Sequence, residues 1–482
     1  MNNVDEVISK IGFGKFHLFV LLTMGMMDSC DAMEILLLAF IGPILSCSWL
    51  INFIEISFLS TCVFIGMIIG SLVLGRFSDI YGRKPTLLLS NGGIFYFGLL
   101  SSISPNIYWM MISRLCVGIF IGGNASTMYS VISEMTPNKL RGTSMVIMQL
   151  FWSFGSFLIT TISFLVIPAL SWRILLIFST IMTVPILLAL IWLPETPKFL
   201  LLQNQKSKCL EIINKIAKWN NSEYIIDLKE SDVTEYSFRD LFHPNYLSTT
   251  IICWILWFVT GISYYGIVLI ITIINEIPHR CLQNMATFSN TIKNNLNETI
   301  DNSCCLKIHY KDTFISTAGE ILFMPISIIL INAIGRRRTL SIYFLTISIL
   351  SFCLNLRLSS LHLSILLFFL RGTVNAIFNV IFIYTAEVFP TSVRGSSIGM
   401  NYSISRFGAL VSPFIINLVI VRYSFLAGTL TLCGLNVSAF ILSMLLPYET
   451  KDRKLYQTAD HGNTESKPLI FGKIFNYQTT TK

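Results

Sequence analysis

Three carboxylates lie three residues apart within one long apolar stretch of this sequence. Asp28, Asp31 and Glu34 occur in MMDSCDAMEI, and the flanking residues are mostly apolar from 18 to 45. On a helix they fall within an arc of about 120°, so a single face would carry all three. Burial and crowding both oppose loss of the proton, so we expect at least one of these acids to bind and release protons near neutral pH.

The helix that carries these acids belongs to a membrane protein. Of the 482 residues, 53% are hydrophobic and 12% are charged, and the mean hydropathy is +0.68; soluble domains have about 25% charged residues. Each central carboxylate costs about 2.5 to 3.5 kcal/mol to insert, so this face must turn inward to a hydrated cavity. Long apolar runs predict an all-α fold with twelve transmembrane helices, near residues 16–45, 56–75, 86–103, 108–132, 143–168, 171–193, 247–275, 313–334, 339–357, 361–386, 396–421 and 425–446.

The runs form two groups of six, separated by a polar linker. We predict a first bundle at 1–193, a cytoplasmic linker with amphipathic helices at 194–246, a second bundle at 247–446 and a cytoplasmic tail at 447–482. Most Lys and Arg residues fall in the termini and the even-numbered loops, which predicts that both termini are cytoplasmic. The linker stretch CLEIINKIAKW is amphipathic and should lie along the membrane face or pack under the bundle.

The loop at 275–312 is then exoplasmic. It contains the acceptor triplet Asn297-Glu298-Thr299, which predicts glycosylation at Asn297. It also contains Cys281, Cys304 and Cys305, so a disulfide is expected there, with its pairing left open.

The two halves repeat three motifs in the same order. GRFSDIYGRK (75–84) matches NAIGRRR (332–338), SEMTPNKLRG (133–142) matches AEVFPTSVRG (386–395), and LPETPK matches LPYETK. Internal repeats of this kind are a common way to build secondary transporters.

These motifs resemble the major facilitator superfamily, on its sugar-porter and organic-ion-porter side. The segments DAMEILLLAFIGPILSCSW, RDLFHPNYLSTTIICWILWFVTGISYYG and YTAEVFPTSVRG look like its synaptic-vesicle-related (SVOP-like) branch. The resemblance implies two pseudo-symmetric six-helix bundles that rock around a central cavity. It supports Asp31 and Glu34 as functional acids, whereas Asp28 lies outside it and is expected at the water-exposed mouth of the cavity.

Ion pairs near the cytoplasmic loops are expected to act as a gate. Gly75 and Gly82 permit a tight turn, and Asn332 replaces Asp79 in the second copy of the motif. The alternative for the basic residues is topogenic charge alone. The predicted gating residues are Asp79, Arg83, Lys84, Arg114, Glu134, Arg141, Arg371, Glu387 and Arg394. Arg114 and Arg371 occupy repeat-equivalent places in the fourth and tenth spans, where the alternative is a structural ion pair with the buried acids.

Two further intramembrane charges point to the substrate. Glu320 lies in the eighth span and Arg406 in the eleventh, and such charges are functional by default. The stretch SRFGALVSP around Arg406 is similar to organic-anion carriers, and a guanidinium suits bidentate capture of a carboxylate. We therefore favour an anion. The excess of acids argues for a cation, and a neutral or zwitterionic substrate stays open.

Aromatic residues of the seventh span are candidates for the substrate pocket. Trp257, Tyr264 and Tyr265 lie in WFVTGISYYG, and their alternative role is packing. Trp257 and Phe258 replace the paired glutamines of the sugar-porter pattern, which counts against a hexose.

The motifs of common enzymes are missing from the sequence. It contains no GxxxxGK[ST] or HExxH, so we predict no enzyme activity, cofactor, metal or nucleic-acid partner. The sequence predicts a secondary active carrier of a small organic ion, driven by protons or a counter-substrate, in the plasma membrane or a vesicle membrane. The alternative is a transport-inactive protein of the same fold that serves as a vesicle receptor or scaffold, which Asn332 favours.

Overall fold

A computed structural model describes residues 4–49, 51, 53–137, 140–203, 205–222, 244–276, 310–356, 358–389, 394–419 and 424–450. These ranges are helical and contain no strand. The predicted glycosylation site Asn297 and the cysteines Cys281, Cys304 and Cys305 lie outside them, as does most of the predicted tail.

The helices of the first half follow the predicted spans. They are α2 (Lys15–Trp49), α3 (Phe53–Tyr81), α4 (Arg83–Ser102), α5 (Ile107–Met135), α6 (Arg141–Ala169), and α7 (Trp172–Ile181) with α8 (Thr183–Trp192). Because α7 and α8 follow one another with only Met182 between them, they form one span. This half therefore supplies six spans.

The second half repeats this pattern. Its helices are α11 (Pro244–Glu276), α13 (Tyr310–Ile334), α14 (Arg336–Cys353), α15 (Ser360–Val388), α16 (Arg394–Pro413) with the π-helical η3 (Phe414–Leu418), and α18 (Phe425–Met444). Within the described residues eight helical segments, with α7 and α8 taken as one, are long and apolar enough to cross a membrane. Of the helices at predicted spans, α2, α4, α14 and α16 fall outside that set, and α2 carries the three acids.

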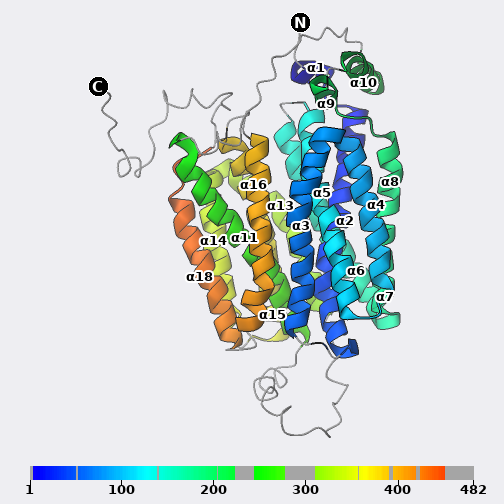
Figure 1. Ribbon diagram of the computed structural model, residues 1–482. Coiled ribbons are helices and arrows are strands. Elements are labelled where there is room, and N and C mark those ends of the chain that lie inside the picture. Colours follow the sequence, from blue (N-terminus) through cyan, green and yellow to red (C-terminus); the bar gives the residue numbers. More distant parts are fainter. Residues whose placement is uncertain are drawn as a thin grey trace, which may run out of the picture.

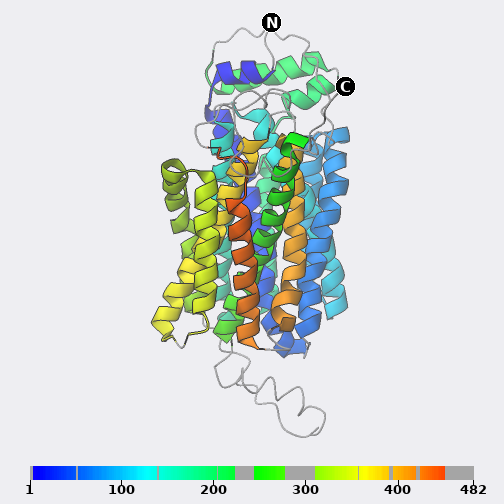
Figure 2. The same cartoon turned by 90° about the vertical axis from the view of Figure 1, so that its left-hand side faces the viewer.

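The two halves lie side by side (Figure 1). They meet where α3 contacts α16, where α6 contacts α13 and where α2 contacts α11. The short helices α1 (Val4–Ile11), α9 (Pro197–Leu202) and α10 (Lys206–Trp219) lie across one end of the bundle, which we call the linker end; Figure 2 shows the same end turned by 90°.

The amphipathic linker helix packs under the bundle. The apolar side of α10 buries Cys209, Ile213 and Ile216. Its last residue, Trp219, makes an edge contact with Phe16 at the start of α2, with ring centres 5.7 Å apart. Burial raises the pKa of the Cys209 thiol to about 11, so this cysteine stays protonated. The helix α1 was not predicted, because eight residues are too few for a clear periodic signal.

Close approach of α3 and α5 depends on glycine. A Cβ added at Gly122 would lie 2.1 Å from the Met67 carbonyl oxygen, and one at Gly118 would lie 2.2 Å from that of Val63. Both neighbours are backbone atoms and cannot move aside as a side chain could. Close packing of α3 against α5 therefore requires glycine at both positions.

Replacing Gly122 by valine is expected to separate α3 from α5 and to destabilise the protein by about 3 kcal/mol or more. The matched control is Gly92→Val in α4, where an added Cβ meets nothing within 4 Å. Thermal unfolding of the two variants in detergent separates the packing effect from the change in helix propensity. Equal unfolding midpoints would contradict this explanation.

Candidate substrate and coupling site

The acidic face of α2 is turned inward. The exposed fractions of Asp28, Asp31 and Glu34 are 1%, 2% and 0%. The sequence expectation that Asp28 lies at a water-exposed cavity mouth is wrong, because the neighbouring helices cover it as completely as they cover the other two acids. Each acid has different partners.

Glu34 forms an ion pair inside the first half. Its Oε2 lies 2.7 Å from Nη1 of Arg114 on α5, and neither side chain has any exposed surface. Ser179 on α7 donates to the other carboxylate oxygen at 2.7 Å, while Arg114 also donates to Ser101 at 2.9 Å. Both carboxylate oxygens of Glu34 are therefore hydrogen-bonded in a fully buried ion pair, while Nε of Arg114 has no hydrogen-bond partner.

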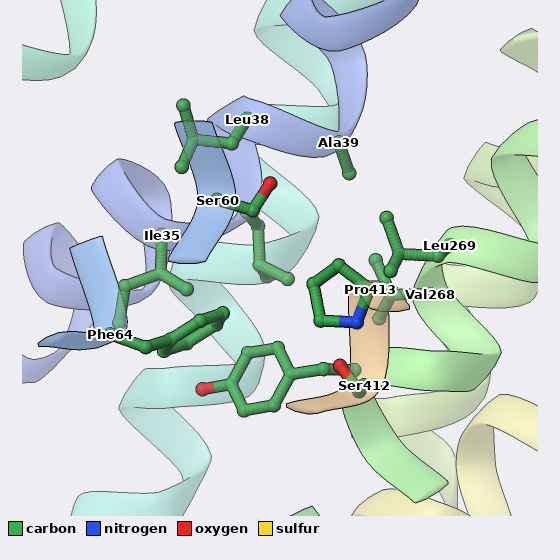
Figure 3. A pocket seen from close by; sticks show the side chains of 11 residues that line it. Ile35, Leu38, Ala39, Ser60, Phe64, Val268, Leu269, Ser412 and Pro413 are labelled. Atoms are coloured by element: carbon green, nitrogen blue, oxygen red, sulfur yellow. The ribbon is translucent and has the colours of Figure 1, made fainter. Parts of the chain in front are cut away.

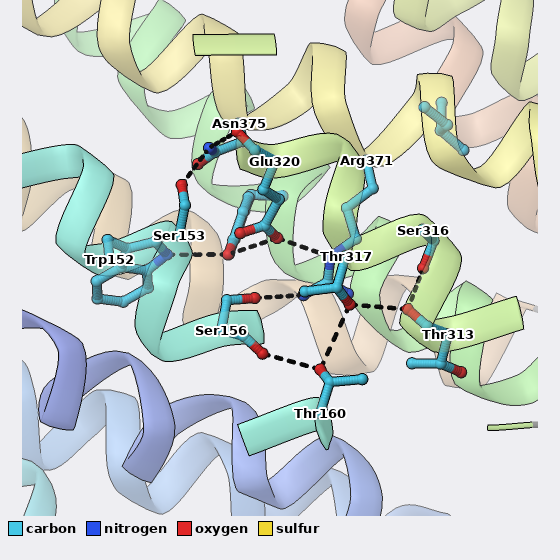
Figure 4. A network of polar contacts seen from close by, with 12 residues as sticks. Trp152, Ser153, Ser156, Thr160, Thr313, Ser316, Thr317, Glu320, Arg371 and Asn375 are labelled. Atoms are coloured by element: carbon cyan, nitrogen blue, oxygen red, sulfur yellow. Dashed lines mark hydrogen bonds and ion pairs between the residues drawn. The ribbon is translucent and has the colours of Figure 1, made fainter. Parts of the chain in front are cut away.

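Glu320 forms the corresponding pair in the second half. Nε of Arg371 on α15 lies 2.7 Å from Oε1 of Glu320 on α13, and the Tyr264 hydroxyl donates to the same oxygen at 3.2 Å. Unlike the first pair, this one is linked to the other half (Figure 4). Arg371 donates to Ser156 on α6 at 3.1 Å, and Trp152 on α6 donates to Tyr264 at 2.9 Å.

A single hydrated pocket shared by Asp31, Glu34, Glu320 and Arg406 is therefore not what the structure shows. Glu34 and Glu320 are held in separate buried pairs, which is the alternative that the sequence left open for Arg114 and Arg371. In each half the acid and its arginine come from two helices of the same bundle, α2 with α5 and α13 with α15. The structure places these two arginines with the buried acids and not with the loop residues of the predicted gate.

Asp28 and Asp31 have no such partner. Asn124 on α5 donates to Asp31 at 3.2 Å, and Asn91 on α4 donates in turn to Asn124 at 2.9 Å. One oxygen of Asp28 is buried without a hydrogen-bond partner. Within the described ranges neither aspartate has a basic side-chain nitrogen within 4.0 Å of its carboxylate oxygens. Asp28 and Asp31 are therefore two buried acids without a basic side chain in direct contact.

Arg406 on α16 lies among aromatic side chains. It donates hydrogen bonds to the hydroxyls of Tyr265 and Tyr402. Its guanidinium carbon lies 4.3 Å from the ring centre of Tyr402 and 5.8 Å from that of Trp152 on α6. We call Trp152, Tyr265 and Tyr402 the arginine cage.

In the described part of the chain no carboxylate oxygen lies within 4.0 Å of the guanidinium nitrogens of Arg406. The Nε of Arg406 is buried without a hydrogen-bond partner. Asp28 interacts with Arg406 electrostatically at longer range. Arg406 is 4% exposed, so the charge is closed off from solvent in this structure. Trp152, Tyr402 and Asn124 were missed by the sequence reasoning, because an aromatic or amide in an apolar span carries no charge to mark it.

Figure 3 shows an apolar pocket. It has a volume of about 30 Å³ in this structure and is bounded by α2, α3, α11 and the end of α16. Tyr265 belongs to its wall. Of the three aromatic residues predicted to line a pocket, the structure places Tyr265 at this pocket and Tyr264 in the Glu320 network. Trp257 packs within the second half, where its indole donates to Thr385 at 3.0 Å.

The predicted gating residues of the loops lie at the linker end. Arg83 pairs with Glu134 at 2.9 Å and with Asp79 at 3.3 Å, and Lys84 donates to the Ile191 carbonyl at 2.7 Å. Glu195, from the LPETPK motif, accepts from the backbone N–H of Arg83 at 3.0 Å. Arg141 lies at the start of α6.

The second half copies this arrangement. Arg336 pairs with Glu387 at 2.8 Å, and Glu449 accepts from the Arg336 backbone N–H at 2.8 Å. The turns before both arginines use glycines with positive φ, Gly82 at 109° and Gly335 at 93°. Asn332 supplies no carboxylate to match Asp79. Arg394 begins α16. These contacts lie within each half, so they fix the loop at each copy of the motif.

Two six-helix halves with buried charges between them define a membrane transporter, and the chain belongs to the major facilitator superfamily. Residues 49–277 match the family model described as sugar (and other) transporter, and residues 313–479 match that described as Major Facilitator Superfamily.

In the described residues no group of three His, Cys, Asp or Glu could hold a metal ion.

Relatives of the chain match it over almost its whole length. The chain is 34% identical to the SVOPL protein of Mus musculus, over 94% of this chain and 93% of that protein. It is 30% identical to the synaptic vesicle 2-related protein of Xenopus laevis, over 95% and 82% respectively. The xylose transporter XylE from E. coli, in a partially occluded inward-open conformation, has the same fold, with a TM-score of 0.66 and 15% identity over 91% of this chain and all of that one.

Proposed function

We propose that this protein is a secondary active carrier of a small organic anion, which it moves by alternating access together with protons. The observation that carries the proposal is Arg406, a buried guanidinium with no carboxylate partner at 4.0 Å among the described residues. Keeping such a charge away from water is costly unless an anion binds to it.

The geometry of the arginine cage suits an anionic head group. The hydroxyls of Tyr265 and Tyr402 hold the guanidinium in place, and the rings of Trp152 and Tyr402 lie beside it. A planar guanidinium held in this way presents parallel N–H donors to a carboxylate. The partly satisfied donor set therefore favours an anion over a cation.

The two unpaired aspartates are the candidates for proton coupling. Glu34 and Glu320 already neutralise arginines, so releasing their charge would break buried ion pairs. Asp28 balances Arg406 electrostatically when it is ionised. Protonation of Asp28 would remove the negative charge that balances Arg406, and the substrate anion could then balance the guanidinium instead. Binding of the proton and binding of the anion would therefore favour one another.

Replacing Arg406 by alanine is expected to lower the affinity for the transported anion by about 10- to 100-fold, because charge-assisted hydrogen bonds are lost. Arg406→Lys keeps the charge without the planar fork and should give an intermediate loss. The measurement is uptake by proteoliposomes from a panel of organic anions and cations, with exposed Lys208→Ala as the control. Anion uptake with unchanged affinity in Arg406→Ala would overturn the proposal.

A second candidate is a transport-inactive receptor or scaffold in a vesicle membrane. Asn332 favours it, because the second copy of the loop motif lacks the acid that contacts Arg83 in the first. Flux of any panel compound in proteoliposomes would exclude this alternative.

The orientation belongs to the same proposal. The basic loop motifs, α1 and α10 share the linker end, so we place this end and both termini in the cytoplasm. The membrane would be the plasma membrane or that of an intracellular, synaptic-type vesicle, with Asn297 glycosylated on the opposite side.

A further inference from the structure

We propose that the substrate anion is amphipathic: its carboxylate binds Arg406 and its apolar body fills the pocket on the other side of Tyr265. This inference rests on the carrier function proposed above and names the substrate class. It is independent of which acid carries the proton.

The pocket is suited to an apolar occupant. Apolar side chains supply most of its wall, so an apolar group would meet a matching surface there. The polar residues of its wall are few: Ser60, Ser412 and Tyr265. Ser412 donates to the Ala409 carbonyl at 2.9 Å, and Tyr265 receives a hydrogen bond from Arg406. The rest of the wall is Ile35, Leu36, Leu38, Ala39, Phe64, Val268, Leu269 and Pro413.

Tyr265 joins the pocket to the charged site. Its ring is part of the pocket wall, and its hydroxyl contacts the guanidinium of Arg406. Phe64 on α3 makes an edge contact with the same ring, with centres 4.8 Å apart, and lines the pocket as well. A molecule with a carboxylate at one end and a hydrocarbon at the other could therefore contact both sites around this one ring.

The same walls exclude strongly polar substrates from the pocket. A polyhydroxylated molecule would give up hydrogen bonds with water and find few replacements among these side chains, so its burial would be unfavourable. An alkyl or aryl group has no hydrogen bonds with water to lose, and its transfer from water into the pocket is favourable.

The pocket also lies where the two halves must separate. The helices α2 and α3 come from the first half, and α11 and α16 from the second. At the end of α16, Pro413 lines the pocket and is followed by the π-helical η3, and π-helical turns are frequent at functional sites. Phe414 in η3 contacts Phe58 on α3, with ring centres 5.4 Å apart. Rocking of the halves would open this wall and release the apolar group.

The test is equilibrium binding of acetate, butyrate, hexanoate and octanoate to the purified full chain, measured by titration calorimetry. Affinity is expected to rise by about fourfold per added methylene until the pocket is full. In Ala39→Phe, which fills the pocket from α2, the ratio of octanoate affinity to acetate affinity should fall toward one. Ser60→Phe makes the same test from α3, should the first variant fail to give a monodisperse protein.

Leu72→Phe is the matched control, because it adds a ring to α3 at a position that is 65% exposed. It should keep the wild-type ratio. Affinity that is independent of chain length, failure of all four carboxylates to bind, or a chain-length dependence that survives in both pocket variants would overturn the amphipathic assignment. The carrier proposal fails separately, when Arg406→Ala leaves the uptake of every organic anion unchanged.

Discussion

Replacing Arg114 by methionine is expected to lower the free energy of unfolding by about 3 to 5 kcal/mol, because it leaves the Glu34 carboxylate buried without its cation. The pair has no exposed surface, so water cannot take the place of the guanidinium. Ser179 would still donate to one carboxylate oxygen, but a neutral donor compensates only part of a buried charge.

The double variant Glu34→Met with Arg114→Met is expected to be more stable than either single variant, since it removes both charges together. Thermal unfolding in detergent measures this coupling, with Lys206→Met on the exposed side of α10 as the control. A double variant as unstable as the sum of the two single variants would show that Glu34 and Arg114 do not act as a pair.

Replacing Asp31 by asparagine is expected to abolish pH-dependent uptake. Asparagine has nearly the shape of a protonated aspartate but cannot exchange the proton, so net uptake should no longer increase when the side from which substrate enters is acidified. Asp28→Asn is expected to have the same effect and, in addition, to remove the charge that balances Arg406. Exchange of labelled for unlabelled substrate should continue in both variants.

The measurement is the ratio of initial uptake rates at acidic and neutral pH in proteoliposomes. Glu6→Gln makes the same kind of change at an exposed position in α1 and should keep the wild-type ratio. An unchanged ratio in both aspartate variants would exclude Asp28 and Asp31 from coupling. The proton would then have to use one of the paired glutamates, and the proposed division of roles would be wrong.

Much of the fold could be predicted because it depends on local properties of the chain. Twelve spans follow from the length of the apolar runs, which must match the bilayer thickness. The repeated glycine turns at Gly82 and Gly335 follow from motifs that stand at equal places in the two halves. The helix α10 follows from its apolar periodicity.

The sequence by itself also determined that the three acids of α2 share an inward face, because helical geometry and the cost of charge in hydrocarbon leave no other choice. Only the tertiary structure decided which acid is neutralised and which is free. Glu34 pairs with Arg114, which lies 80 residues further along the chain. Asp31 accepts a hydrogen bond from Asn124, and both Asp28 and Asp31 interact electrostatically with the caged Arg406 at longer range. These partners depend on how helices that are distant in the sequence pack against one another. An ion pair forms only when the two charged groups lie within a few ångströms. The apolar periodicity of a single helix does not predict that distance.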